Sequence, residues 1–150
     1  MILYFDASSI VSLHLAERNR HDELSRLRGA ADIVASSRVS YAEARAALDL
    51  ARREPRPTPR LSIEAYQAAV LALTEDWPSY YRIDVSEQLV QRAGGLAEKH
   101  HLKGYDAVQL SSALALNEEL SNELRFSTWD RALARAAQRE GLTLAHEVTP

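Results

Sequence analysis

The stretch Ile2-Leu3-Tyr4-Phe5-Asp6 decides the fold, because four apolar or aromatic residues follow one another and an acid ends the run. A short apolar run without alternation is typical of a strand that is buried on both faces of a parallel sheet. In open sheets of this kind the carboxyl ends of strands and the amino ends of the following helices share one edge, where ligands bind. We therefore expect Asp6 at a ligand-binding edge.

The rest of the 150-residue chain alternates short apolar stretches with longer helical ones. We predict strands at residues 2–5, 32–36, 80–85 and 124–128, with a further edge strand at 142–145. The predicted helices begin near Ser8 and cover residues 21–28, 40–53, 62–75, 86–101, 105–116 and 130–140. Three prolines between Glu54 and Pro59 cannot continue a helix, and they form a stiff link between two helices. The pattern predicts a single α/β domain over residues 1–150, with a parallel sheet of four to five strands between helical layers.

Composition narrows the classes of function. The chain has no cysteine, which excludes disulfides, thiolate metal sites and cysteine nucleophiles, and fits a cytoplasmic protein. Charges interrupt every apolar run, so we expect no membrane span, and the amino terminus does not resemble a signal peptide. The net charge is −3, from 18 basic and 21 acidic residues. If four acids bind a cation, the remaining 17 acidic and 18 basic residues have a net charge of +1. This charge permits a polyanionic substrate but gives it little support.

Four acids stand at the expected strand ends and helix starts, namely Asp6, Glu43, Asp106 and Asp130. Carboxylates that converge on one edge repel one another unless a hard cation binds between them. Oxygen ligands without cysteine or clustered histidine suit Mg²⁺ or Mn²⁺ better than Zn²⁺. The sequence therefore predicts a metal site, and a catalytic one.

Each acid taken alone has an ordinary explanation as a helix cap. Ser40 and Glu43 fit a capping box, and Asp6 competes with Ser8 or Ser9 to cap the first helix. Asp106 and Asp130 would favour the positive ends of helix dipoles. The joint pattern favours the metal site, because an unpaired carboxylate after a buried strand is costly.

Further residues are candidates for supporting roles. The hydroxyl groups of Ser8 and Thr128 can orient carboxylates without crowding them. We expect Arg45, Arg52 and Arg53 to contact phosphates and Tyr41 to stack on bases, with a solvated helix face or core packing as the competing explanations.

Four blocks of sequence resemble the acidic blocks of PIN-domain ribonucleases, most closely those of VapC-type toxins from bacterial toxin–antitoxin systems. They are Asp6-Ala7-Ser8-Ser9, Tyr41-Ala42-Glu43, Tyr105-Asp106-Ala107-Val108-Gln109-Leu110-Ser111-Ser112-Ala113-Leu114 and Phe126-Ser127-Thr128-Trp129-Asp130. The resemblance runs from Ile2 to about Leu144, with the blocks in family order.

The resemblance implies a parallel sheet between helices and RNA cleavage that depends on Mg²⁺ or Mn²⁺. It implies a metal site made by Asp6, Glu43, Asp106 and Asp130, with Ser8 as the supporting hydroxyl. It also implies a homodimer and neutralisation by an antitoxin protein encoded in the same operon.

Two alternatives stay open from the sequence. One is a housekeeping RNA-processing nuclease of the same fold. The other is a receiver-like signalling domain, which also gathers acids on a parallel sheet. Receivers carry paired acids near the first strand and a late lysine, whereas this chain has one acid after its first strand and no lysine in residues 126–130.

Overall fold

In the computed structural model, which describes residues 1–15, 18–55, 59–120 and 123–148, five strands form one sheet in the order β3-β2-β1-β4-β5. Every neighbouring pair of strands is parallel. The strands are β1 (Ile2–Phe5), β2 (Ile33–Ser37), β3 (Tyr81–Ile83), β4 (Leu124–Ser127) and β5 (Thr143–Leu144). The predicted α/β fold with a parallel sheet of four to five strands is confirmed.

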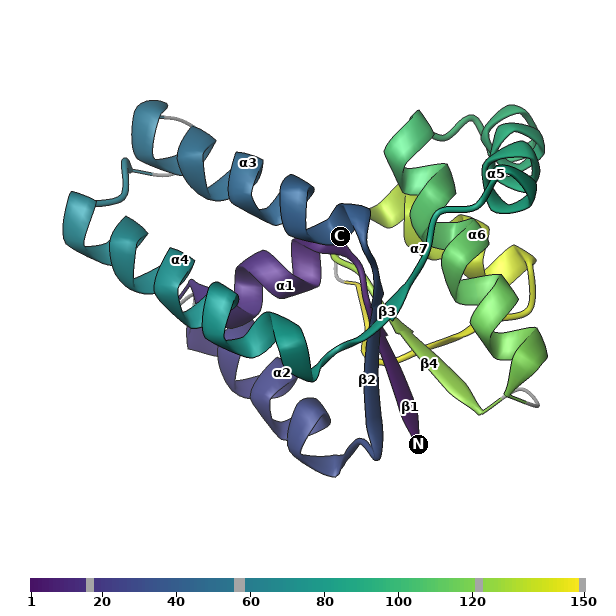
Figure 1. The fold of residues 1–150 in the computed structure, drawn as a ribbon, viewed down its shortest axis with the longest axis horizontal. Coiled ribbons are helices and arrows are strands. Elements are labelled where there is room, and N and C mark those ends of the chain that lie inside the picture. The colour runs from purple at the N-terminus through teal and green to yellow at the C-terminus, as the bar shows by residue number, and fades with distance from the viewer. Residues whose placement is uncertain (16–17, 56–58, 121–122, 149–150) are drawn as a thin grey trace.

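Helices cover both faces of this sheet and give three layers (Figure 1). One layer contains α1 (Ala7–His14), α2 (Arg18–Ala30), α3 (Val39–Arg53) and α4 (Ile63–Asp76), followed by a 3₁₀ turn at Trp77–Ser79. The other contains α5 (Glu87–His100), α6 (Gly104–Glu119) and α7 (Arg131–Arg139). None of the helices in the described ranges combines the length and the apolar character needed to cross a membrane.

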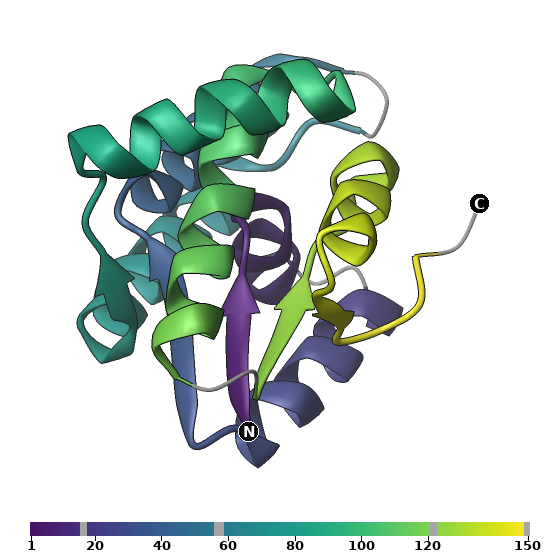
Figure 2. The same ribbon diagram turned by 90° about the vertical axis from the view of Figure 1, so that its right-hand side faces the viewer.

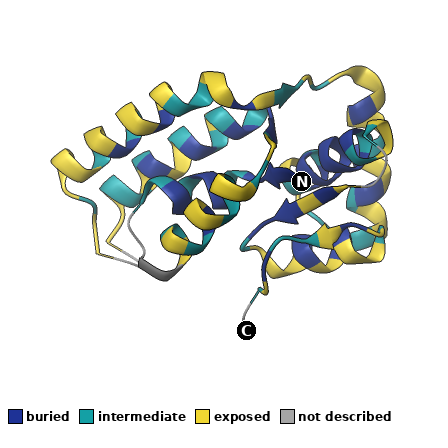
Figure 3. Cartoon of the chain, turned by 90° about the horizontal axis from the view of Figure 1, so that it is seen from below, coloured by how far each residue is buried: buried dark blue, intermediate teal, exposed yellow. Residues whose placement is uncertain are grey.

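The central strand β1 supplies both hydrophobic cores. Its successive side chains point to opposite faces of the sheet. Ile2 and Tyr4 pack into the core under α5 to α7, whereas Leu3 and Phe5 pack into the core under α1 to α4. Figure 3 shows buried strands and inner helix faces, with exposed residues on the outer faces. Burial on both sides is why the run shows no alternation.

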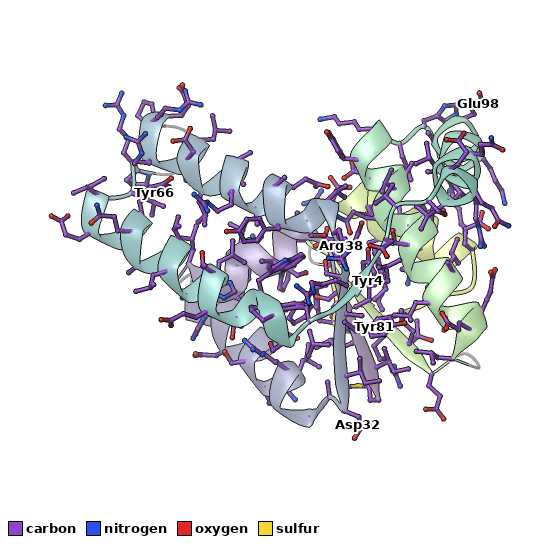
Figure 4. All side chains as sticks on the ribbon, in the orientation of Figure 1. Tyr4, Asp32, Arg38, Tyr66, Tyr81 and Glu98 are labelled. Atoms are coloured by element: carbon purple, nitrogen blue, oxygen red, sulfur yellow. The ribbon has the colours of Figure 1, made fainter. Side chains whose placement is uncertain are left out.

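The pair α3 and α4 extends away from the sheet (Figure 1). Tyr66, labelled in Figure 4, lies near the outer end of this pair, where the Arg52 guanidinium stands 5.3 Å from its ring centroid. The backbone N–H of Leu61 donates to the carbonyl of Ala51, which closes the connection between the two helices. Residues 56–58 of the predicted proline link lie outside the described residues.

Several local predictions were wrong. The capping box fails because α3 begins at Val39, so that Ser40 lies inside the helix, where its hydroxyl accepts a hydrogen bond from Ser36. Asp6, not Ser8 or Ser9, caps α1. The helix predicted at residues 21–28 is longer and spans Arg18–Ala30; Gly29 stays within it, since one helical glycine costs only about 1 kcal/mol.

Candidate functional site

The polar site lies at the carboxyl end of β1. The chain leaves β1 towards β2 on one side, and β4 lies on the other side. The crevice between the ends of β1 and β4 is therefore a topological switch point, where open α/β sheets bind ligands. Asp6 directly follows β1 and Thr128 directly follows β4, so both residues stand at this point.

Asp6 is a buried carboxylate, only 4% exposed. Oδ1 accepts hydrogen bonds from the backbone N–H of Ser9 at 2.9 Å and from the Ser8 hydroxyl at 2.7 Å. Oδ2 accepts one from the Thr128 hydroxyl at 2.6 Å. The Ser8 hydroxyl in turn accepts from the backbone N–H of Trp129 at 3.0 Å. These contacts join the start of α1 to the segment after β4, and they orient Asp6 from two sides.

A second polar chain lies behind Asp6. The Ser9 and Ser127 hydroxyls are 2.8 Å apart, and Ser127 Oγ is 2.9 Å from Nε2 of His146. Burial lowers the pKa of His146, which favours the neutral ring. The Trp129 and His146 rings stack with their centroids 4.0 Å apart. The Arg20 guanidinium lies 4.6 Å from the centroid of the Trp129 ring. Packing within the protein thus occupies the Trp129 ring.

Glu43 reaches the site from α3 and contacts α6 through Gln109. The side-chain amide of Gln109 donates to Oε1 of Glu43 at 3.2 Å and to the Ser40 hydroxyl at 2.8 Å. The buried Tyr4 hydroxyl donates to the carbonyl oxygen of Gln109 at 2.7 Å. Because a carboxylate only accepts hydrogen bonds, Glu43 fixes the side of the amide that carries the nitrogen, and the carbonyl oxygen then faces the Tyr4 hydroxyl.

Asp106 and Asp130 approach from the starts of α6 and α7. Asp106 lies in the first turn of α6 and is half-buried. Asp130 is exposed and caps α7, where its Oδ1 accepts from the backbone N–H of Leu133 at 2.8 Å. Its own N–H donates to the Thr128 hydroxyl at 3.0 Å, so Thr128 links Asp130 to Asp6.

The four acids affect one another electrostatically. Burial raises the pKa of Asp6, against the effect of its hydrogen bonds. Burial also raises the pKa of Glu43, and the charges of Asp6 and Asp106 raise it further. The pKa of Asp106 is raised by burial and by the charge of Asp130, with Lys103 opposing. Burial and neighbouring charges therefore disfavour the negative charge of Asp6, Glu43 and Asp106, three of the four acids that the sequence singled out.

The carboxylate oxygens of the four acids are the type of ligand that a hard divalent cation prefers. Carboxylate oxygens that are partly desolvated and repel one another are stabilised by such an ion. Within the residues that the structure describes, no three acidic or histidine side chains stand close enough to share one ion as they are placed. Asp106 and Glu43 would have to turn towards Asp6 to bind one.

The predicted RNA contacts lie farther away. Arg52 and Arg53 stand nine and ten residues beyond Glu43 on α3, about 14–15 Å along the helix axis, and both donate to Asp49. The Arg45 guanidinium donates to the Tyr41 hydroxyl at 3.0 Å, and the Tyr41 ring packs against Trp77. Ser8 and Thr128 contact Asp6 directly, whereas the contacts of these four residues are with other partners.

Sequence reasoning missed Gln109 and His146. Gln109 had a signal, because it is a polar residue in the apolar run after Asp106 and shares that acid's helix face at i, i+3. His146 had none, because its contact with Ser127 forms only when the segment after β5 folds back.

Comparison with known proteins finds relatives that match nearly the whole chain. A family model described as PIN domain matches residues 3–139, from β1 to α7. The chain is 33% identical over 148 residues to ribonuclease VapC45 of Mycobacterium tuberculosis (strain CDC 1551 / Oshkosh), across 96% of this chain and 94% of that protein. Ribonuclease VapC49 of strain ATCC 25618 / H37Rv has the same identity and coverage.

Replacement of Gln109 should reveal the hydrogen-bond network around it. Gln109→Leu leaves the buried Tyr4 and Ser40 hydroxyls without this partner. We expect the free energy of unfolding to fall by about 3 kcal/mol, since each buried polar group left without a hydrogen bond costs roughly 1–3 kcal/mol. Tyr4→Phe combined with Gln109→Leu should cost less than the sum of the two single changes, as measured by urea unfolding. Gln67→Leu, an exposed glutamine of α4, is the matched control. Additive costs in the double variant would contradict the network.

Removal of the Asp106 charge should stabilise the metal-free protein. An acid whose pKa is raised by folding binds more protons in the folded state, so stability falls as pH rises from about 4 through the raised value. Asp106→Asn should therefore raise the melting temperature in chelator at pH 7 and flatten its decline above about pH 4. Millimolar Mn²⁺ should stabilise the wild type and have little effect on the variant.

The control for this test is Asp22→Asn, which removes one charge from an exposed position of α2 and should leave both the pH profile and the Mn²⁺ effect unchanged. The opposite outcome is that Asp106→Asn lowers the melting temperature in chelator and that Mn²⁺ still stabilises the variant fully. Asp106 would then only stabilise the start of α6 and would not bind metal.

Proposed function

The chain belongs to the PIN domain family, and we propose that it is an endoribonuclease toxin that requires Mg²⁺ or Mn²⁺. The observation that carries the proposal is Asp6, a buried carboxylate at the switch point with Ser8 and Thr128 as donors. The ribonuclease names of two full-length relatives support RNA as the substrate. The family match leaves no support for the receiver-like alternative.

The residues proposed to bind the metal are Asp6, Glu43, Asp106 and Asp130. When bound to these residues, such an ion would supply activation of a water molecule and neutralisation of the charge on the scissile phosphate. The protein itself holds the Asp6 carboxylate in one orientation through Ser8 and Thr128. Gln109 positions the Glu43 carboxylate from the other side of the site. Arg45, Arg52, Arg53 and Tyr41 remain proposed RNA contacts along α3.

We expect Asp6→Asn and Asp106→Asn each to abolish RNA cleavage while the protein stays folded. Glu43→Gln should be strongly impaired. Asp130→Asn should retain partial activity, because asparagine caps a helix as well as aspartate does and Asp130 is the most exposed of the four. Cleavage of labelled RNA in Mg²⁺, in Mn²⁺ and in chelator measures these effects, with circular dichroism to check folding. A near wild-type rate for Asp6→Asn or Asp106→Asn in Mg²⁺ would refute the site.

The proposed partner is a cognate antitoxin whose basic side chain enters the acidic edge. An arginine there can supply without metal the positive charge that the carboxylates need. We expect a small protein encoded beside this chain to co-purify with it, and nuclease activity to appear when it is removed. A partner whose release leaves the activity unchanged would contradict this arrangement. Toxicity on expression, relieved by that partner, separates the toxin from the housekeeping nuclease.

The proposal includes a homodimer and a cytoplasmic location, where RNA is available. Three large apolar side chains on the extended α3–α4 pair support the dimer, because a second copy of the chain could bury them. Leu50, Ile63 and Leu71 are 51%, 48% and 59% exposed. Sedimentation of the purified chain measures the oligomeric state.

A further inference from the structure

A row of arginines runs along α7, directly after the acidic edge. Arg131, Arg135 and Arg139 recur every four residues and are all exposed. Successive members of such a row lie about 6 Å apart along the helix axis. Their guanidinium groups make no ion pair or hydrogen bond with another residue that the structure describes. The acid at the end of this helix, Glu140, contacts Lys99 and His100 instead.

Two of these arginines line a groove. The groove has a volume of about 730 Å³ and lies between α7 and the segment from β5 to Val148, which pass side by side in Figure 2. Arg131, Arg135 and Gln138 line it from the helix, opposite Leu144 and Val148 on the segment. It thus combines positive charge and hydrogen-bond donors with an apolar wall. Glu147 is the one acid among its lining residues.

The groove is joined to the site by covalent and hydrogen-bonded links. Arg131 directly follows Asp130 in the chain. His146 also lines the groove and contacts Ser127, the residue before Thr128, which donates to Asp6. A strand of RNA with its scissile phosphate at the acidic edge would therefore have its neighbouring phosphates within reach of α7.

We infer that this groove binds the sugar–phosphate backbone of single-stranded RNA beside the cleaved bond, with Arg131 and Arg135 contacting phosphates. The inference rests on the proposed function. Charge complementarity carries it: the acids at the edge repel a polyanion, so attraction must come from cations next to them. In α3, by contrast, Arg52 and Arg53 share Asp49, which offsets their charge. The apolar wall offers contact to a base or ribose.

The test measures RNA binding apart from cleavage. A labelled oligoribonucleotide is titrated with protein in chelator at several salt concentrations. Arg131→Gln and Arg135→Gln should each weaken binding about 3- to 10-fold at roughly 0.1 M salt and reduce the salt slope by about one phosphate contact. Arg135→Lys, which keeps the charge, should retain most of the slope. With Mg²⁺, the glutamine variants should raise KM and leave kcat unchanged.

The matched control is Arg26→Gln, an exposed arginine of α2 in the other helical layer, which should bind RNA as the wild type does. If the wild type cleaves and binds RNA but both α7 variants keep its affinity and slope, the groove inference is overturned and the proposed function stands. If the α7 variants instead lose only the antitoxin, the groove belongs to a protein partner and the inference is likewise overturned. A wild type that neither binds nor cleaves RNA overturns the proposed function itself.

Discussion

The structure depends on one constraint, the placement of the Asp6 carboxylate at the end of a strand buried on both faces. Removing a carboxylate from water is costly unless donors or a cation compensate for the lost hydration. Ser8, Ser9 and Thr128 supply donors, and each comes from a segment that β1 and β4 bring together. The same contacts fix the start of α1 and the approach to α7. The compensation is incomplete, because burial still raises the pKa of Asp6.

The remaining electrostatic repulsion acts between neighbouring acids and supports the proposed binding of a cation. Glu43 and Asp106 are also partly desolvated, and each has its pKa raised further by a neighbouring carboxylate. A metal ion or an arginine from another protein would relieve the same repulsion. The proposed activation by metal and the proposed inhibition by a protein partner would therefore both follow from one local shortage of positive charge.

The sequence predicted the fold well because its main signals are local. The unalternating run before Asp6 and the helical periodicity of the following stretches each indicate an element without reference to distant residues. The spacing of the four acids then placed them on one edge through the general rule for parallel sheets. The local signal misled where a distant contact competed with it. Ser40 looked like an N-cap, but its hydroxyl accepts instead from Gln109, 69 positions away.

The parts of the site that escaped sequence reasoning all depend on such distant contacts. Tyr4 and Gln109 are 105 positions apart, and their hydrogen bond engages the amide oxygen while the amide nitrogen donates to Glu43. The contact of His146 with Ser127 likewise needs the segment after β5 in its folded place. Arginine spacing on α7 was visible in the sequence, but its meaning depends on which acids lie nearby. Only the fold puts three exposed arginines, which make no ion pair with another residue that the structure describes, beside carboxylates that are only partly compensated. That pairing of opposite charges agrees with the proposed binding and cleavage of an RNA backbone.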